Sequence, residues 1–171
     1  MLGWLDHAET GGGAAAHALM RDLAARLSAS GVAVRGALQT SETAADDCHC
    51  EMTLHILGDD GPDVVISQDL GAEARGCRLD SGALELAAQR VLDTLPDAEL
   101  LILNKFGKQE IFGRGMVAVI AAAMDRDLPV LISVAPQQKA EFAEFAGELA
   151  TKVKPGDLAA WAARATQPRA A

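Results

Sequence analysis

The sequence predicts an α/β domain with a mainly parallel β-sheet, and two observations support this prediction. Apolar runs of strand length alternate along the chain with amphipathic stretches of helical period, as in strands joined by crossover helices. Neither an internal repeat nor a low-complexity linker interrupts the 171 residues. We therefore expect one domain over residues 1–166 and a frayed tail at residues 167–171.

The elements of the N-terminal half follow from apolar spacing and from glycines. Residues 2–5 predict a short buried strand. A polar loop ending in three glycines then leads to a helix over residues 14–30, where apolar side chains share one face. Gly31 suits the position just beyond this helix, and residues 32–39 alternate as a second strand. Residues 51–57 and 63–67 flank a Gly-Asp-Asp-Gly-Pro turn, which predicts an inserted β-hairpin.

The C-terminal half continues the alternation. Asp80 or Ser81 is expected to cap a helix that runs to about residue 95. Residues 99–104 and 128–134 predict buried strands, with a charged loop at 105–115 and a helix at 115–126 between them. A further helix follows Pro136, and a last short helix begins near residue 155. The helix after Pro136 carries one apolar stripe, formed by Phe142, Phe145, Ala146 and Leu149.

Composition and charge exclude several classes of protein. Half of the residues are apolar, enough for a real core, yet the longest apolar runs fall far short of the ~18–20 residues of a membrane helix. The formal net charge of −9 and the 4% aromatic content argue against nucleic-acid binding, which needs basic surfaces and stacking rings. The N-terminus lacks the pattern of a signal peptide and the three cysteines are an odd number, so we expect a reducing cytoplasm.

A charged, glycine-punctuated loop follows the predicted strand at residues 99–104. It contains Asn104, Lys105, Lys108, Glu110 and Arg114 and runs into the next predicted helix. Ligands in open α/β sheets bind at the carboxyl ends of strands, and cations beside a helix N-terminus attract anions. These residues therefore allow an anion-binding loop, with a solvated connecting loop as the alternative.

Three motifs are distinctive when they are taken together. Residues 101–110 read Leu-Ile-Leu-Asn-Lys-Phe-Gly-Lys-Gln-Glu and lead to Gly-Arg-Gly, residues 66–71 read Ile-Ser-Gln-Asp-Leu-Gly, and residues 76–80 read Gly-Cys-Arg-Leu-Asp. They resemble an uncharacterised bacterial family of short P-loop-NTPase-like proteins, which are often encoded beside molybdate-transport genes. The resemblance extends from the first helix to about Trp161. It implies a P-loop-NTPase-like sheet and a role in molybdate homeostasis, with molybdate or another oxyanion as the ligand.

Two departures from the nucleoside-triphosphatase pattern bear on hydrolysis. A Walker A loop needs a Lys for the β- and γ-phosphates and a hydroxyl for Mg²⁺. Residues 6–13 read Asp-His-Ala-Glu-Thr-Gly-Gly-Gly, which keeps the glycines, lacks that Lys and hydroxyl, and puts Asp6 and Glu9 where triphosphate charge would arrive. Asn104 stands at the position of the Walker B acid and cannot supply a carboxylate to Mg²⁺. The sequence thus predicts a degenerate Walker A loop without efficient hydrolysis of Mg-nucleotide.

The glycines at 11–13 have two interpretations. Gly11, Gly12 and Gly13 at the start of a helix can form a nest of successive N–H groups that binds an anion. The alternative is a flexible turn that binds no ligand.

The most metal-like segment is Cys48-His49-Cys50, to which Cys77 is a candidate third thiolate. Thiolates and imidazole bind zinc or copper, and thiolates also suit molybdenum. However, the period of a strand places Cys48 and Cys50 on the apolar face of residues 48–56, where free cysteines are commonly buried as small hydrophobes. Both interpretations stay open.

Three further side chains complete the candidate site and its surroundings. Arg78 is a candidate for bidentate contact with an oxyanion. His7 and His17 stand alone in the sequence, and we interpret each as structural or exposed.

The function that these observations favour is oxyanion binding linked to molybdenum homeostasis. A small anionic ligand is the expected partner, and a homodimer, a molybdate transporter or a molybdenum-cofactor protein are further candidates. A divergent nucleoside triphosphatase, with Glu110 positioning the attacking water, is one alternative. A non-catalytic module for a transporter or a cofactor-assembly partner is the other.

Overall fold

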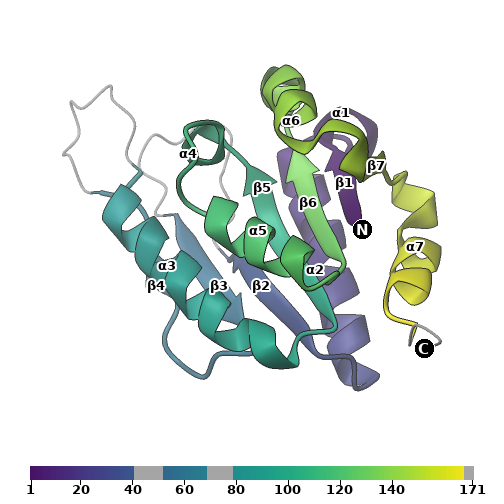
Figure 1. Cartoon of the computed structure of the whole chain (residues 1–171), viewed down its shortest axis with the longest axis horizontal. Helices are drawn as coiled ribbons and strands as arrows, with labels where there is room; N and C mark the ends of the chain where they lie inside the picture. Colours follow the sequence, from purple (N-terminus) through teal and green to yellow (C-terminus); the bar gives the residue numbers. More distant parts are fainter. Residues whose placement is uncertain (41–51, 69–78, 168–171) are drawn as a thin grey trace.

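The computed structural model describes residues 1–40, 52–68 and 79–167 and confirms the α/β prediction. Within these residues a seven-stranded sheet has the order β4-β3-β2-β5-β6-β1-β7 (Figure 1). Parallel pairing joins five strands, β2 (Val34–Gln39), β5 (Leu100–Phe106), β6 (Val130–Val134), β1 (Leu2–Asp6) and β7 (Ala150–Lys152). The predicted hairpin is present as β3 (Thr53–Leu57) and β4 (Val64–Val65), which extends the sheet antiparallel to β2.

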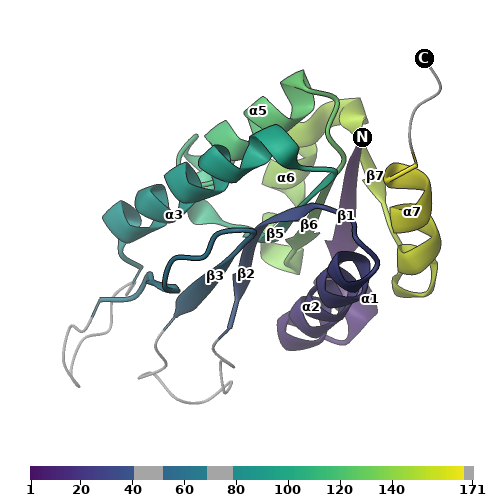
Figure 2. The same cartoon turned by 90° about the horizontal axis from the view of Figure 1, so that it is seen from below.

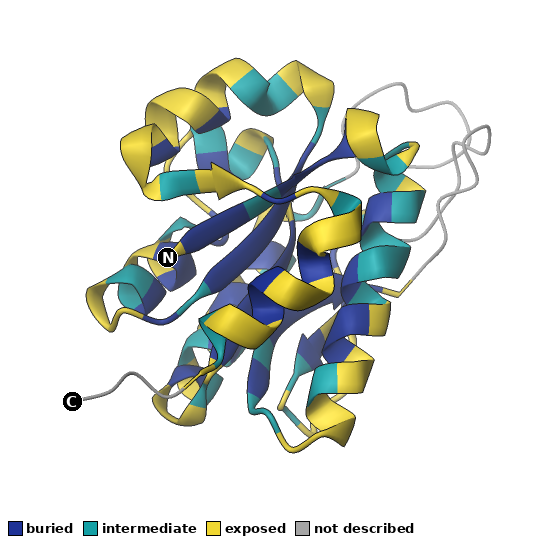
Figure 3. Ribbon diagram, turned by 90° about the vertical axis from the view of Figure 1, so that its right-hand side faces the viewer, coloured by how far each residue is buried: buried dark blue, intermediate teal, exposed yellow. Residues whose placement is uncertain are grey.

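Helices cover both faces of the sheet (Figure 2). One face packs against α2 (Gly13–Ala29) and α7 (Leu158–Ala165), and the other against α3 (Ser81–Thr94), α5 (Val117–Asp125) and α6 (Lys139–Ala146). The central strands are buried on both sides, whereas each helix alternates buried and exposed residues (Figure 3). The short helices are α1 (His7–Thr10) and α4 (Lys108–Ile111), and the 3₁₀ turns are η1 (Leu95–Asp97), η2 (Pro136–Gln138), η3 (Gly147–Leu149) and η4 (Pro155–Asp157).

Strand β2 lies unusually close to β5 at Gly36. This glycine has φ of +136°, and a Cβ added there would lie 1.9 Å from the carbonyl oxygen of Ile102. Only glycine avoids both the clash and the backbone strain. The close pairing brings the carboxyl ends of β2 and β5 together at the edge where the candidate residues lie.

The connections after β1 and β6 leave the sheet on opposite faces. These strands are neighbours, yet β1 leads to α2 on one face while β6 leads to α6 on the other. In open α/β sheets such a switch in direction opens a crevice at the carboxyl ends of the strands, where ligands bind.

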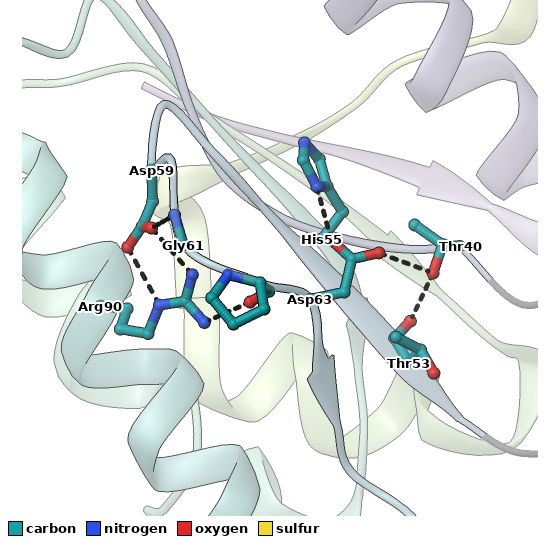
Figure 4. A network of polar contacts seen from close by, with 8 residues as sticks. Thr40, Thr53, His55, Asp59, Gly61, Asp63 and Arg90 are labelled. Atoms are coloured by element: carbon teal, nitrogen blue, oxygen red, sulfur yellow. Dashed lines mark hydrogen bonds and ion pairs between the residues drawn. The ribbon is translucent and has the colours of Figure 1, made fainter.

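A polar network holds the hairpin turn against α3 (Figure 4). The Arg90 guanidinium donates from Nε to Asp59 Oδ2 (3.0 Å) and from Nη2 to Asp59 Oδ1 (2.8 Å), and it also donates to the carbonyl oxygen of Pro62 (2.6 Å). These hydrogen bonds from Arg90, with one from the Gly61 N–H, lower the pKa of Asp59 to about 2. On the outer side of the hairpin, His55 Nδ1 contacts Asp63 at 2.8 Å.

Some elements differ from those predicted. Strand β5 continues through Phe106, so Lys105 belongs to a strand rather than to a loop. Strand β7 was not predicted, because its three residues are half-buried or exposed and show no apolar alternation. Phe145 and Leu149 do not join Phe142 in the core: their exposed fractions are 40% and 66%. The helix α6 ends at Ala146, before the stripe is complete. Across the described ranges, every helix is too short or too polar to cross a membrane.

Candidate functional site

A cavity of about 800 Å³ opens at the carboxyl ends of β1, β2, β5 and β6. Its wall combines polar residues from the strand ends with apolar residues from the hairpin side of the sheet. The polar part is formed by His7, Gly12, Gly13, His17, Gln39, Asn104, Lys105, Lys108, Gln109, Glu110, Gln137 and Gln138. The strand-end location agrees with the place that the sequence analysis assigned to the ligand.

The acidic residues of the loop after β1 are paired with lysines from distant elements. Asp6 is buried, caps α1 by accepting from the Ala8 N–H (2.9 Å), and forms an ion pair with Lys139 of α6. Burial opposes ionisation of Asp6, but the hydrogen bonds from Lys139 and the Ala8 N–H outweigh it and lower its pKa. Glu9 pairs with Lys152 of β7 at 2.6 Å. Both carboxylates are therefore neutralised, and they oppose an incoming anion less than the sequence suggested.

The glycines after α1 form a tight turn. The N–H groups of Gly11 and Gly12 both donate to the carbonyl oxygen of His7, and the two residues have φ of +89° and +116°. Gly12 is the N-cap of α2, Gly13 is its first residue, and no side chain caps the helix. The anion nest predicted at residues 11–13 therefore has two N–H groups already bonded. The open donors are those of the first turn of α2, where Gly12 and Gly13 line the cavity.

Two histidines that stand alone in the sequence meet in the wall of the cavity. The rings of His7 and His17 pack edge to face with their centroids 5.6 Å apart. Burial and the positive charge of Lys105 lower the pKa of His7. The negative charge of Asp6 raises it, but by less. Burial and the nearby His7, Lys105 and Arg21 charges lower the pKa of His17 to about 4. Both imidazoles are therefore neutral at pH 7. One feature of the sequence indicated that His7 could lie at the site, because His7 comes just after the predicted strand at residues 2–5.

His7 is held by a hydrogen-bonded chain to β6 and β5. The Ser133 hydroxyl donates to the carbonyl oxygen of Asn104, so His7 Nε2–H donates to Ser133 Oγ at 2.9 Å. This assignment leaves His7 Nδ1 as an acceptor. Ser133 is completely buried and does not line the cavity, so the pair does not act as a nucleophile and base toward a ligand.

Asn104 joins the ends of β5 and β2. Its Oδ1 accepts from the Gln39 N–H at 3.3 Å, and its Nδ2 donates to Gln39 Oε1 at 3.2 Å. Asn104 is buried and lines the cavity. Its amide thus ties the ends of β5 and β2 together in the cavity wall.

Glu110 stabilises the loop after β5. Its Oε2 accepts from the Gly107 N–H (2.9 Å) and its Oε1 from the Met116 N–H (3.0 Å), and the residue is buried. Glu85 of α3 assists by accepting from the Gly115 N–H at 2.7 Å. A catalytic role for Glu110 stays a prediction, and in this arrangement both carboxylate oxygens already have backbone partners.

The predicted cations divide into two groups. Lys105 and Lys108 line the cavity, are exposed, and make no ion pair or hydrogen bond in the part of the chain that the structure describes. Arg114 is exposed but lies outside the cavity wall. Arg78 and the three candidate metal ligands, Cys48, Cys50 and Cys77, lie outside the described residues. Within residues 1–40, 52–68 and 79–167, no group of three or more His, Cys, Asp or Glu is arranged to hold a metal ion.

Comparison with known proteins places the chain in a family. It belongs to the family described as "Protein of unknown function (DUF2478)", which matches residues 8–161. It is also similar to the "Molybdenum import ATP-binding protein ModC 2" of Bradyrhizobium diazoefficiens, with 31% identity over 134 residues. The match covers 78% of this chain but only 15% of that relative, whose name describes the whole protein. No solved structure matches the chain.

Proposed function

We propose that this member of the DUF2478 family binds an oxyanion, either molybdate or a phosphate-type group, in the cavity at the strand ends, without efficient hydrolysis of nucleotides. The observation that carries the proposal is the pair of cations in the cavity wall, Lys105 and Lys108, which have no partner among the residues that the structure describes. The similarity to a molybdenum import protein supports a role beside molybdenum transport.

The electrostatics of the cavity favour an anion although the whole chain carries a net charge of −9. The nearby carboxylates of Asp6 and Glu9 are paired with lysines, and that of Glu110 accepts two backbone N–H groups. Lys105 and Lys108 have no counterion within the described residues. Beside them the uncapped first turn of the 17-residue helix α2 adds the positive end of a helix dipole.

The same wall lacks groups that nucleotide hydrolysis needs. The turn after β1 contains no lysine, and Asn104 provides an amide where Mg²⁺ would require a carboxylate. Glu110 accepts a backbone N–H group at each carboxylate oxygen, which ties it to the loop after β5.

A thermal-shift panel tests this proposal on the purified, reduced chain. The probes are molybdate, tungstate, sulfate and phosphate, with ATP and GTP each tested in the presence of Mg²⁺. We expect stabilisation by at least one oxyanion, because saturation at ~100 times the Kd adds about 2.7 kcal/mol to the free energy of unfolding. A selective response to molybdate and tungstate would identify the oxyanion as molybdate-like. The absence of any response to the four inorganic anions would refute the proposal.

Lysine variants locate the bound anion. Lys105→Ala and Lys108→Ala should each raise the Kd of the responding anion by about tenfold, since a hydrogen bond to a charged group contributes ~1.5–3 kcal/mol. The matched control is Lys154→Ala, which removes the same charge from an exposed residue away from the cavity. Equal Kd values for all three variants would place the anion elsewhere.

A nucleotide-binding function is the second candidate, because the relative's name includes ATP binding. A nucleotide-binding function predicts a thermal shift with Mg-ATP or Mg-GTP but not with the inorganic anions. Hydrolysis would add phosphate release that depends on Mg²⁺. Mg²⁺-dependent phosphate release by the unmodified chain would move the triphosphatase interpretation to first place.

A further inference from the structure

The cavity is much larger than an inorganic oxyanion. Its volume of about 800 Å³ falls in the range of ~300–1,000 Å³ that is usual for pockets enclosing organic ligands. A single tetrahedral anion beside Lys105 and Lys108 would leave most of this space to water. The size of the cavity therefore indicates a ligand with a larger body than molybdate or phosphate alone.

The wall beyond the strand ends is apolar. Ala37 of β2, Leu54 of β3, Leu84 of α3 and Met116 line the cavity and belong to the core between the sheet and α3. Their side chains offer no hydrogen-bonding groups, so this part of the cavity, which we call the apolar recess, suits hydrocarbon or the face of a ring.

The cavity reaches both faces of the sheet at the strand ends. The recess faces α3, whereas His7, Gly13 and His17 belong to α1 and α2 on the other face (Figure 2). Three glutamines, Gln109, Gln137 and Gln138, also line the cavity, and their side-chain amides have no hydrogen-bond partner in the described part of the chain. The wall of the cavity thus combines cationic, amide and apolar side chains.

The hairpin side of the recess is formed by Leu54 of β3 with Met52 and Ile66, which directly precede β3 and follow β4. At the other end of the hairpin, the bidentate contact of Arg90 with Asp59 fastens the turn to α3.

We propose that the ligand is a small organic anion in which a phosphate-type head is joined to an apolar body. The head lies beside Lys105 and Lys108, and the body occupies the recess next to Leu54 and Leu84. This inference rests on the proposed anion site and adds to it the chemical class of the ligand.

A series of alkyl phosphates tests the inference, because the head stays constant while the body grows. Calorimetric titration of the full chain with methyl, butyl and hexyl phosphate, beside inorganic phosphate, measures each Kd. We expect the Kd to fall by about twofold to fourfold for each added methylene, since burying a methylene contributes ~0.8 kcal/mol.

A pair of matched variants shows where the alkyl chain lies. Met52 is half-buried in the wall of the recess, and Val65 is 45% exposed on the same hairpin but outside the wall. Met52→Gln should weaken the binding of hexyl phosphate by about fivefold and leave methyl phosphate unchanged, as expected for lost apolar contact. Val65→Gln should leave both Kd values unchanged.

The outcomes separate the inference from the function on which it rests. If methyl phosphate binds and hexyl phosphate binds no more tightly, the apolar body is refuted and the anion site survives. If molybdate, tungstate, sulfate and inorganic phosphate all fail to bind, the anion site itself is refuted. The series on the unmodified chain decides between these outcomes even if Met52→Gln does not fold.

Discussion

The loops after β1 and β5 reach the same cavity, yet their charges are arranged in opposite ways. In the loop after β1, both acids have lysine partners from other elements, Asp6 with Lys139 and Glu9 with Lys152. At the end of β5 and after it the arrangement is reversed. Glu110 accepts from backbone N–H groups, while Lys105 and Lys108 make no ion pair among the described residues.

This difference distinguishes the two loops by the charges that remain available to a ligand. Both segments contain glycines and charged residues in sequence, so composition alone does not distinguish them. What distinguishes them is which charges remain without a partner, since an unpaired cation retains its field for a ligand. The comparison supports the proposed anion site beside Lys105 and Lys108, and the following predictions test the difference between the two loops by stability measurements.

The largest expected effect comes from Glu110→Ala. The substitution leaves two backbone N–H groups, those of Gly107 and Met116, without their acceptor in a buried loop. We expect a loss of about 3 kcal/mol in the free energy of unfolding, because hydrogen bonds to charged groups contribute ~1.5–3 kcal/mol each and are not additive. Urea denaturation measures it. A loss below about 0.5 kcal/mol would mean that Glu110 does not hold the loop.

A smaller loss is expected for Asp6→Asn. The amide can still accept from the Ala8 N–H, but the ion pair with Lys139 is removed. Because Lys139 is 38% exposed, we expect a loss of about 1–2 kcal/mol, less than for a fully buried pair.

The pH dependence provides the control for the Asp6 prediction. The pKa of Asp6 is lowered in the folded state, so its contribution to stability is present above its unfolded pKa and is lost as pH falls through the folded pKa. The difference between the unmodified chain and Asp6→Asn should therefore shrink as pH falls below ~4. A difference that does not change with pH would rule out the ion pair as its source.

The two histidines in the cavity wall predict a loss of stability in mild acid. The pKa of His17 is about 4 in the folded chain, against ~6.5 when unfolded, so between these values the unfolded state binds a proton that the folded state does not. Stability should fall by about 1 kcal/mol as pH is lowered from ~6.5 to ~4, after allowance for partial exposure. His17→Gln should flatten this part of the urea-midpoint profile. Parallel profiles for the two proteins would contradict the assignment.

The smallest effect is expected for Lys152→Ala. Its ion pair with Glu9 is exposed on both sides, with exposed fractions of 42% and 36%. Such surface pairs contribute ~0.2–1 kcal/mol, so the urea midpoint should barely move. A loss as large as that of Asp6→Asn would show that the exposed pair is as important to the loop after β1 as the buried one.

Much of the architecture followed from local patterns along the chain. The helices α2 and α3, the hairpin, and the strands β5 and β6 appear where apolar periodicity and turn residues predicted them. Asp80 caps α3 by accepting from the Ala83 N–H at 3.0 Å, as the sequence suggested. Strand β7 was not predicted, because an edge strand of three residues needs no apolar face and therefore shows no apolar alternation in the sequence.

The candidate site could be predicted only in part. Asn104, Lys105 and Lys108 line the cavity because the carboxyl ends of parallel strands meet at one edge. Arg114 lies only six residues after Lys108 but outside the wall. Closeness in sequence could not show that Lys108 lines the cavity while Arg114 does not. The path of the chain between them depends on the turn at α4 and on the hydrogen bonds of Glu110.

The sequence by itself determined the order of elements and the residue types at the ends of the strands. Only the tertiary structure decided which charges cancel and where space remains. His7 meets Ser133 across 126 residues, and Lys152 meets Glu9 across 143. These contacts depend on the placement of β1 between β6 and β7. Periodicity records only which face of an element is buried, whereas ion pairs and cavities depend on which elements become neighbours.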